Sequence, residues 1–419
     1  MLHAPLSVGF STLFLAYELI IKSWKEILML VASVLMVIAA YRHRQLKLFK
    51  EPLLIAISIY AMLHILTAIG FGTEVSVQSV LAGFLIDLRY VLFFVLVYIA
   101  VRLYPGLRRP FIAVGIAGAV LVSVFALLQV FVLPYDVLKY IGYGASTIAP
   151  YLSLDQNYDF IRINSTLRGP NSLGAYIVIV LACTAAWLIL KKKGLTWQSS
   201  TLVTVLIAGG LVALWASYSR SALVAAIVAV AIVCGLTFIK RIKPVVWAAI
   251  AACVVALGIA FFVARDSSFV ANVILHDNPT TGAEVTSNEA HLDSFWDGFN
   301  RMVRQPFGAG VGSTGSASLL GDKPLIIENQ YFYVAHEVGW LGLLLFVMII
   351  IGVHTRLWDR RKDWLALGVF ASGIGLLLIN ILLPIFVDDT VAIIWWGLAA
   401  LAIGSLSTEY GKIQRTQKP

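Results

Sequence analysis

Long apolar runs, separated by short polar segments, repeat along the whole sequence. Apolar residues within each run are continuous rather than alternating, which favours α-helices over the strands of a barrel. Most runs approach the roughly 20 residues that a helix needs to cross a bilayer. We predict spans near residues 5–22, 26–41, 52–70, 85–103, 110–133, 171–190, 199–217, 221–239, 244–264, 331–353, 364–384 and 388–407. The pattern therefore predicts an all-α, polytopic membrane protein with about 12 transmembrane helices.

The composition agrees with this fold class. The 419 residues are 60% hydrophobic and 13% charged, and the mean hydropathy is +0.89. A helix bundle is expected because every backbone polar group in hydrocarbon needs an internal partner. Cys183, Cys234 and Cys253 fall inside predicted spans without a CxxC pattern, so we expect no disulfide framework, metal site or cofactor. We also expect the first apolar run to remain as a span rather than act as a cleaved signal.

Basic residues sort to one side of the predicted bundle. Six clusters hold 20 of the 31 Lys and Arg residues and follow alternate spans, at 42–50, 102–109, 191–193, 240–243, 356–362 and 412–418. By the positive-inside rule this side is the cytoplasm, and both termini are predicted to lie there. Lys22 and Lys25 fall on the opposite side and make the first hairpin the weakest part of this topology.

The opposite side carries two long loops, at 134–170 and 265–330, within what we predict to be a single integral membrane domain over 1–419. Both loops are short of basic clusters, so the arginines they do carry are candidates for function. These are Arg162, Arg168, Arg265, Arg301 and Arg304. The region 284–345 also gathers charges, histidines, aromatics and a glycine-rich turn between two spans, and it is the first place to look for chemistry.

Arg220 lies in the stretch ASYSRSALVAA, between two predicted spans. The stretch predicts a tight connection at the outer membrane face, with Ser219 and Ser221 beside the arginine. A fixed guanidinium there can bind a phosphate or diphosphate with two parallel hydrogen bonds. The alternative is an arginine that snorkels to lipid headgroups. The lack of a neighbouring acidic residue favours anion binding.

The stretch RGPNSLGAY predicts a turn and a helix start at Gly169, Pro170 and Asn171. Free N–H groups at a helix N-terminus attract anions, and Arg168 stands next to this turn. A simple cap with solvated arginines is the alternative, and for Arg162 the two interpretations are balanced.

Asp87 and Arg89 lie in the predicted span GFLIDLRYVLFF. Residues two apart do not share a helical face, so each needs a partner on another helix. A structural ion pair is the simpler interpretation for Arg89, and a second contact for an anionic substrate is the other. Asp388 and Asp389 are candidate partners for the outer arginines.

The region 284–345 predicts an amphipathic helix, HLDSFWDGFNRMVRQP, with His291 and Ser294 one turn apart. The glycines that follow do not form a P-loop, and we expect them to pack closely over a cavity. Glu328, Asn329 and His336 stand at the start of the next span, and Asn329 and His336, like Arg168 and Asn171, are predicted substrate contacts. Glu328 is a candidate general base or a helix N-terminal carboxylate. His336 is a candidate base or a histidine bonded within the bundle, and Gly339-x-x-Gly342 predicts close helix packing.

Four motifs carry a family resemblance: GPNSLGAY, SRSAL, HLDSFWDG with QPFGAGVG, and ENQYFYVAHEVGWLGLLLF. In this order they resemble the O-antigen ligase and polymerase family of bacterial polysaccharide assembly, over roughly residues 160–350. The resemblance implies a metal-independent, inverting, GT-C-like glycosyltransferase in the inner membrane, acting on its periplasmic face. Such enzymes transfer a glycan from undecaprenyl diphosphate to an acceptor sugar hydroxyl.

The family's first arginine maps onto Arg220, its second arginine falls on His291, and its ligase histidine falls on Glu328, followed by Asn329. These departures favour a capsule or exopolysaccharide polymerase over a lipid A-core ligase, which is the alternative. A lipid-carrier flippase is less favoured because the sequence has no internal repeat. The implied partners are the lipid-linked donor, an acceptor glycan or lipid, and polysaccharide assembly or chain-length proteins. The aromatic candidates for sugar stacking are Trp296, Tyr331, Phe332 and Tyr333.

Overall fold

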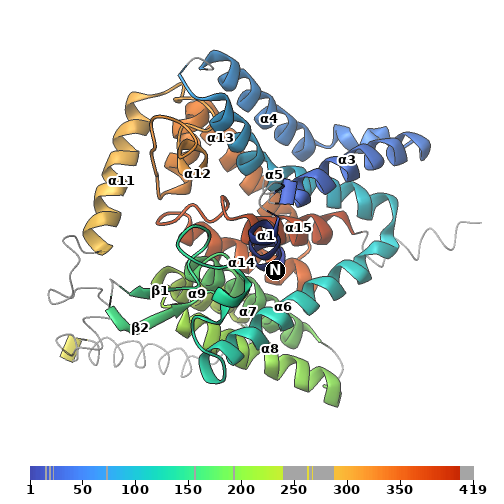
Figure 1. The fold of residues 1–419 in the computed structure, drawn as a ribbon. Helices are drawn as coiled ribbons and strands as arrows, with labels where there is room; N and C mark the ends of the chain where they lie inside the picture. The colour runs from blue at the N-terminus through green and yellow to red at the C-terminus, as the bar shows by residue number, and fades with distance from the viewer. Residues whose placement is uncertain are drawn as a thin grey trace, which may run out of the picture.

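The computed structural model describes residues 1–14, 17, 20, 21, 23–71, 74–154, 157–191, 194–238, 262, 263, 267 and 287–405, and Figure 1 shows their largely helical arrangement. The N-terminal half contains α1 (His3–Leu13), α3 (Trp24–Arg42), η2 (Leu46–Lys50), α4 (Pro52–Gly70), α5 (Val77–Leu103), η3 (Pro105–Leu107), α6 (Arg108–Phe131) and η4 (Val137–Ile141). An antiparallel hairpin of β1 (Tyr151–Leu154) and β2 (Asn157–Ile163) follows. The rest contains α7 (Pro170–Leu190), α8 (Trp197–Ala216), α9 (Arg220–Phe238), α11 (Ser287–Arg304), α12 (Gly315–Ser318), α13 (Gln330–Asp359), α14 (Trp364–Ile379) and α15 (Asp389–Gly404).

Eight of the described helices are long and apolar enough to cross a membrane. They are α3, α4, α5, α6 with η3, α7, α8, α9 and α13, while α14 and α15 are shorter apolar helices. This confirms a helical, multi-pass membrane protein. The predicted span at 244–264 lies almost wholly outside the described residues.

The first predicted span, 5–22, is wrong. His3 Nε2 lies 3.0 Å from Asp389 Oδ2, and the Lys25 ammonium contacts the same oxygen. A segment that crossed the bilayer would separate its two ends by about 30 Å. Because both ends meet at one carboxylate, residues 3–25 do not cross, and the N-terminus lies on the side of Arg168 and the 134–170 loop. The membrane side of both termini stays a prediction.

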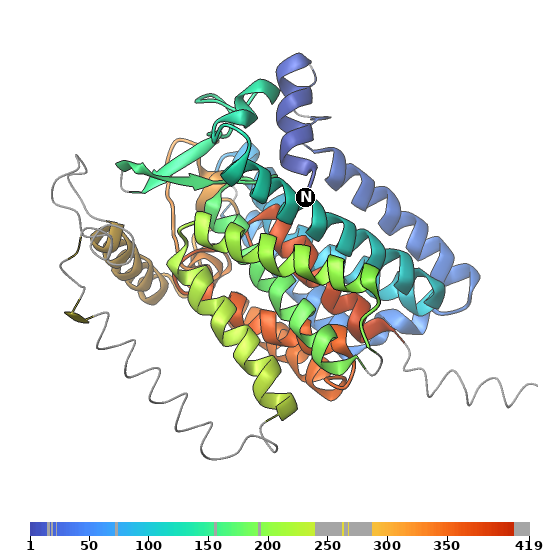
Figure 2. The same ribbon diagram turned by 90° about the horizontal axis from the view of Figure 1, so that it is seen from below.

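Helix α7 forms the centre of the bundle. Thirteen of its 21 residues are buried and none is exposed, as expected for a helix that is apolar all round. It contacts α8, α9, α14 and α15. Figure 2 shows the β1–β2 hairpin and α1 together at one end of the bundle. The N-terminus of α7 lies at this same end of the bundle, next to the hairpin.

Candidate functional site

A three-residue turn, Ser217–Ser219, joins α8 to α9, and Arg220 begins α9. The tight connection predicted from the sequence is confirmed. Tyr218 adopts a left-handed backbone with φ of 46°, which costs roughly 1–3 kcal/mol in a residue other than glycine. Ser217 and Ser219 are buried. A strained turn with buried serines holds the arginine backbone in one place.

The turn lies directly on the first turns of α7 because of Gly174. A Cβ at Gly174 would stand 2.6 Å from the Ala222 Cβ and 3.2 Å from the Ser219 Cβ. These distances are too short for a side chain, so the absence of one permits the contact. Helix α9 and the turn before it therefore approach the α7 N-terminus closely.

Arg162 of β2 fastens the same two elements together. Its Nε donates to the Ser217 carbonyl oxygen at 2.8 Å, and its Nη2 donates to Asn171 Oδ1 at 2.7 Å. A guanidinium can serve two acceptors in fixed directions. From the sequence, Arg162 could equally be a solvated residue or a functional one. In the structure its two hydrogen bonds position the Arg220 turn against α7. The side-chain oxygen of Asn171, a predicted substrate contact, accepts this hydrogen bond from Arg162.

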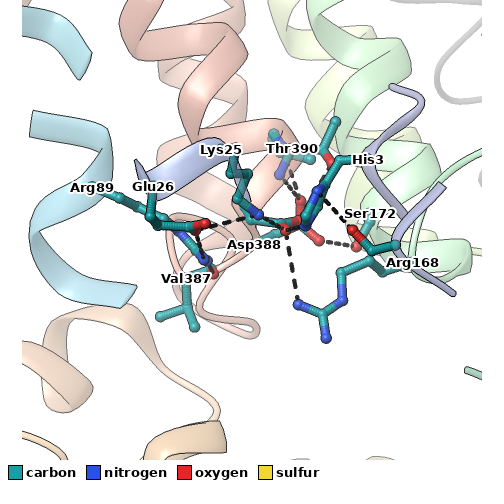
Figure 3. A network of polar contacts seen from close by, with 12 residues as sticks. His3, Lys25, Glu26, Arg89, Arg168, Ser172, Val387, Asp388 and Thr390 are labelled. Atoms are coloured by element: carbon teal, nitrogen blue, oxygen red, sulfur yellow. Dashed lines mark hydrogen bonds and ion pairs between the residues drawn. The ribbon is translucent and has the colours of Figure 1, made fainter. Parts of the chain in front are cut away.

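Asp389, at the start of α15, contacts basic side chains near the start of α7, and Figure 3 labels three of them, His3, Lys25 and Arg168. The carboxylate is 2% exposed, and His3, Lys25 and Arg168 converge on its Oδ2. The Arg168 Nη1 lies 4.0 Å away, and 51% of the Arg168 side chain remains exposed. The predicted pairing of this aspartate with an outer arginine is confirmed. Arg168 touches the carboxylate and still presents its guanidinium to a ligand.

Tyr143, from the segment after η4, lies near this cluster. Its hydroxyl is buried with no hydrogen-bond partner among the described residues. Burial raises the pKa of the Tyr143 phenol, and the Arg168 charge acts in the opposite direction. A neutral phenol beside a half-exposed arginine is a hydrogen-bond donor for an anion, and nothing in the sequence singled it out.

Arg89 lies deeper than Arg168 in the same network. It is 8% exposed, its Nη1 lies 3.8 Å from Glu26 Oε1, and its Nη2 donates to the Val387 carbonyl. Asp87 instead lies beside Glu337 of α13. The prediction that the two residues find partners on other helices is confirmed. The burial of Arg89 favours its structural role over substrate contact.

The segment between α14 and α15 connects α7 to α13. Ser172 donates to Asp388 Oδ2, and Asp388 also accepts from Thr390 N at 3.0 Å and Val391 N at 2.9 Å as the α15 cap. Asn329 Nδ2 donates to the Ile381 carbonyl at 2.7 Å. The start of α13 is thereby held in register with the start of α7.

Asn329 also caps α13, because its Oδ1 accepts from the backbone N–H groups of Tyr331 and Phe332. It is 5% exposed. The predicted substrate contact is thus a capping residue with a structural task. Glu328, immediately before it, is half-buried at the same edge.

Helix α11 confirms the predicted amphipathic helix and packs on α13 through Phe295 and Phe332, whose rings lie 5.1 Å apart. The side chain of His291 is outside the described part of α11. Phe332 and Tyr333 are buried in the core and are therefore unavailable for sugar stacking, whereas Trp296 is 54% exposed.

The glycine-rich segment after α11 docks into a break in α13. Gly339 has φ of 72° inside α13, and the backbone there is not helical. The carbonyls of His336 and Glu337 accept from Ala309 N at 2.6 Å and Gly310 N at 3.2 Å, outside the helix. The expected close packing of the glycines is confirmed, and Gly339 breaks the helix to achieve it. His336 lines a pocket beneath this segment together with Arg301.

The fold and these contacts define a class: a multi-pass membrane protein with a cation-rich site at one end of its central helix. The sequence model of a family described as O-antigen ligase matches residues 205–347. The match runs from α8 into α13 and includes Arg220, Glu328 and His336. No curated protein matches the chain. Residues 205–347 of the chain are therefore similar to the O-antigen ligase family, whose members are glycosyltransferase-like ligases and polymerases.

Proposed function

We propose that this protein transfers a glycan from an undecaprenyl diphosphate carrier to an acceptor sugar hydroxyl, as a polysaccharide polymerase of the inner membrane. One observation carries the proposal: the Arg220 turn is docked on the α7 N-terminus through Gly174 and fixed there by Arg162. The Arg220 turn lies within the matched residues 205–347, and its docking on α7, which precedes them, supports a preorganised cationic site for a diphosphate.

Negative charge builds on the diphosphate as the bond to the sugar breaks. In the proposed reaction, Arg220 and Arg168 stabilise this charge from the two sides of the α7 N-terminus, where N–H groups of the first turn add a positive dipole end. Ser219 and Ser221, whose hydroxyl oxygens lie 3.4 Å apart, offer neutral donors to the same group. His291 is proposed to contact the diphosphate as the second cationic group.

Glu328 is proposed as the base. The acceptor oxygen attacks the anomeric carbon, its proton passes to the Glu328 carboxylate, and the electron pair of the broken C–O bond leaves with the diphosphate. Attack opposite the leaving group inverts the anomeric centre, and the arginines supply the charge stabilisation without a metal ion. The polyprenyl tail stays in the bilayer beside the apolar helices, with the reacting end on the periplasmic side.

Turnover of a lipid-linked repeat unit by purified protein tests this proposal. A polymerase makes a ladder of products from the donor alone, with the lipid diphosphate released in equal amount. Donor that crosses liposome membranes with no new glycosidic bond would show a flippase instead.

Ligase activity is the second candidate because the matched family is described as O-antigen ligase. It predicts no ladder from the donor alone and a single transfer when lipid A-core or another separate acceptor is added.

A further inference from the structure

A pocket of about 530 Å³ lies under the glycine-rich segment, between the start of α5, the end of α11 and α13. Its volume is within the range of about 300–1,000 Å³ that is usual for small-ligand sites. The arginines at the α7 N-terminus do not line it. It is therefore a second polar compartment of the molecule.

Three residues that line this pocket each hold a buried polar atom with no hydrogen-bond partner in the described part of the chain: Gln305 Oε1, Ser313 Oγ and His336 Nδ1. They come from three different segments. The His336 side chain is 3% exposed. Buried polar groups are nearly always paired in folded proteins, so three unpaired atoms around one cavity indicate a ligand that pairs them.

The charges around the pocket balance. Glu74 and Asp322 are matched by Arg301 and Lys323, and the Arg301 Nε is already paired with Asp297 Oδ2 at 2.7 Å. A diphosphate would gain little from such a lining. An amide oxygen, a hydroxyl and an imidazole nitrogen instead suit a neutral ligand that both donates and accepts hydrogen bonds, such as a sugar.

We infer that the pocket lined by Gln305, Ser313 and His336 binds an uncharged segment of a glycan. In the proposed reaction this segment belongs to the acceptor chain, an assignment that rests on the proposed function. Binding itself does not depend on transfer. Serine residues at the start of α5, Ser76 and Ser79, provide further hydroxyls on the opposite wall.

Backbone packing and hydrogen bonds hold the walls of the pocket. Gly312 packs on α5, where a Cβ would stand 2.2 Å from the Ser79 carbonyl oxygen, and Gly312 N donates to Glu337 Oε1 at 3.0 Å. The Ser318 hydroxyl donates to the Leu325 carbonyl at 2.8 Å. The walls are therefore fixed by the protein, and the three unpaired atoms are held in place.

Binding to purified full-length protein tests the inference. The probes are the repeat oligosaccharide of the producing cell, freed of lipid and phosphate, and inorganic pyrophosphate, measured by calorimetry and saturation-transfer NMR. We expect the oligosaccharide to bind, and His336→Ala and Gln305→Ala each to weaken it about tenfold, because each loses a buried hydrogen bond. His336→Ala should leave pyrophosphate affinity unchanged.

His354→Ala is the matched control, because His354 is also a buried histidine of α13 and lies outside the pocket. Ser313→Leu, which fills the pocket, should abolish oligosaccharide binding, and retained detergent-stable protein excludes unfolding as the cause. Absent oligosaccharide binding, equal affinity in all variants, or displacement of the sugar by pyrophosphate would overturn the inference. Donor turnover is measured separately: binding without turnover refutes the transferase proposal alone, and turnover with unchanged acceptor KM in His336→Ala refutes the pocket alone.

Discussion

The site at the α7 N-terminus and the pocket under the glycine-rich segment differ in how they handle charge. At the first, the basic side chains Lys25, Arg89, Arg162, Arg168 and Arg220 outnumber the carboxylates Glu26, Asp388 and Asp389. The second balances its charges and leaves neutral polar atoms unpaired. The proposed transfer of a glycan from a lipid diphosphate to a sugar hydroxyl would use one compartment of each kind. The difference indicates which substrate end each compartment binds.

Asp389→Asn should have the largest effect, because it removes the charge on which His3, Lys25 and Arg168 converge. Leaving the mostly buried Lys25 without its counter-ion is expected to lower the free energy of unfolding by about 3–5 kcal/mol. Thermal and denaturant unfolding in detergent measure this. Asp136→Asn is the control, because its exposed pair with Lys139 should contribute at most about 1 kcal/mol. Equal stability of the two variants contradicts the central role of Asp389.

Arg220→Ala should lower donor turnover by about 10²–10³, or roughly 2.7–4 kcal/mol of transition-state stabilisation. Arg220→Lys should recover only part of this rate, because an ammonium cannot bind two phosphate oxygens in parallel. Arg361→Ala, at an exposed arginine over the Trp358 ring, is the matched control and should keep the wild-type rate. Initial rates at saturating donor distinguish these outcomes.

Gly312→Ala should lower the free energy of unfolding by roughly 1–3 kcal/mol, because the backbone φ at Gly312 is 81° and the new Cβ would meet the Ser79 carbonyl. It should also weaken oligosaccharide binding. Gly115→Ala in α6 meets nothing within 4 Å and should be neutral or stabilising by up to about 1 kcal/mol. A neutral Gly312→Ala would mean that the segment does not pack as described.

Arg162→Met should have the smallest effect, about a tenfold loss of turnover. The substitution keeps much of the apolar stem but removes the bonds to Ser217 and Asn171, each worth about 1.5–3 kcal/mol at most. The Arg220 turn then loses the hydrogen bonds that tie it to α7 and keeps the close packing at Gly174. Diphosphate affinity should fall with the rate, and oligosaccharide affinity should not change.

The sequence predicted the helices better than the contacts between them. Hydropathy located α3 to α9 and α13, because twenty apolar residues in hydrocarbon have few alternatives to a helix. It failed for residues 5–22, since an apolar run of that length gives no sign that both of its ends return to one carboxylate. The contacts of Asp389 bring both ends of this run together, and its partners His3, Lys25 and Arg168 are far apart in sequence.

The site at the α7 N-terminus and the pocket under the glycine-rich segment also differed in how far the sequence predicted them. Arg220, Gly169 and Asn171 stand in short motifs and could be identified from neighbouring residues. The pocket could not, because Gln305, Ser313 and His336 converge only when Gly339 breaks α13 and admits the glycine-rich segment. A glycine in a predicted helix indicates close packing, and it does not say that the helix stops there. Arg162 was undecided for the same reason, because its two acceptors lie on α7 and after α8.

Turnover of the lipid-linked repeat unit by purified wild-type, Arg220→Ala and Arg361→Ala protein tests the central claim most directly. The account predicts glycosidic bond formation with release of undecaprenyl diphosphate in the wild type and in Arg361→Ala, and a rate lower by about 10²–10³ in Arg220→Ala. A folded Arg220→Ala protein that turns over donor at the wild-type rate would contradict it.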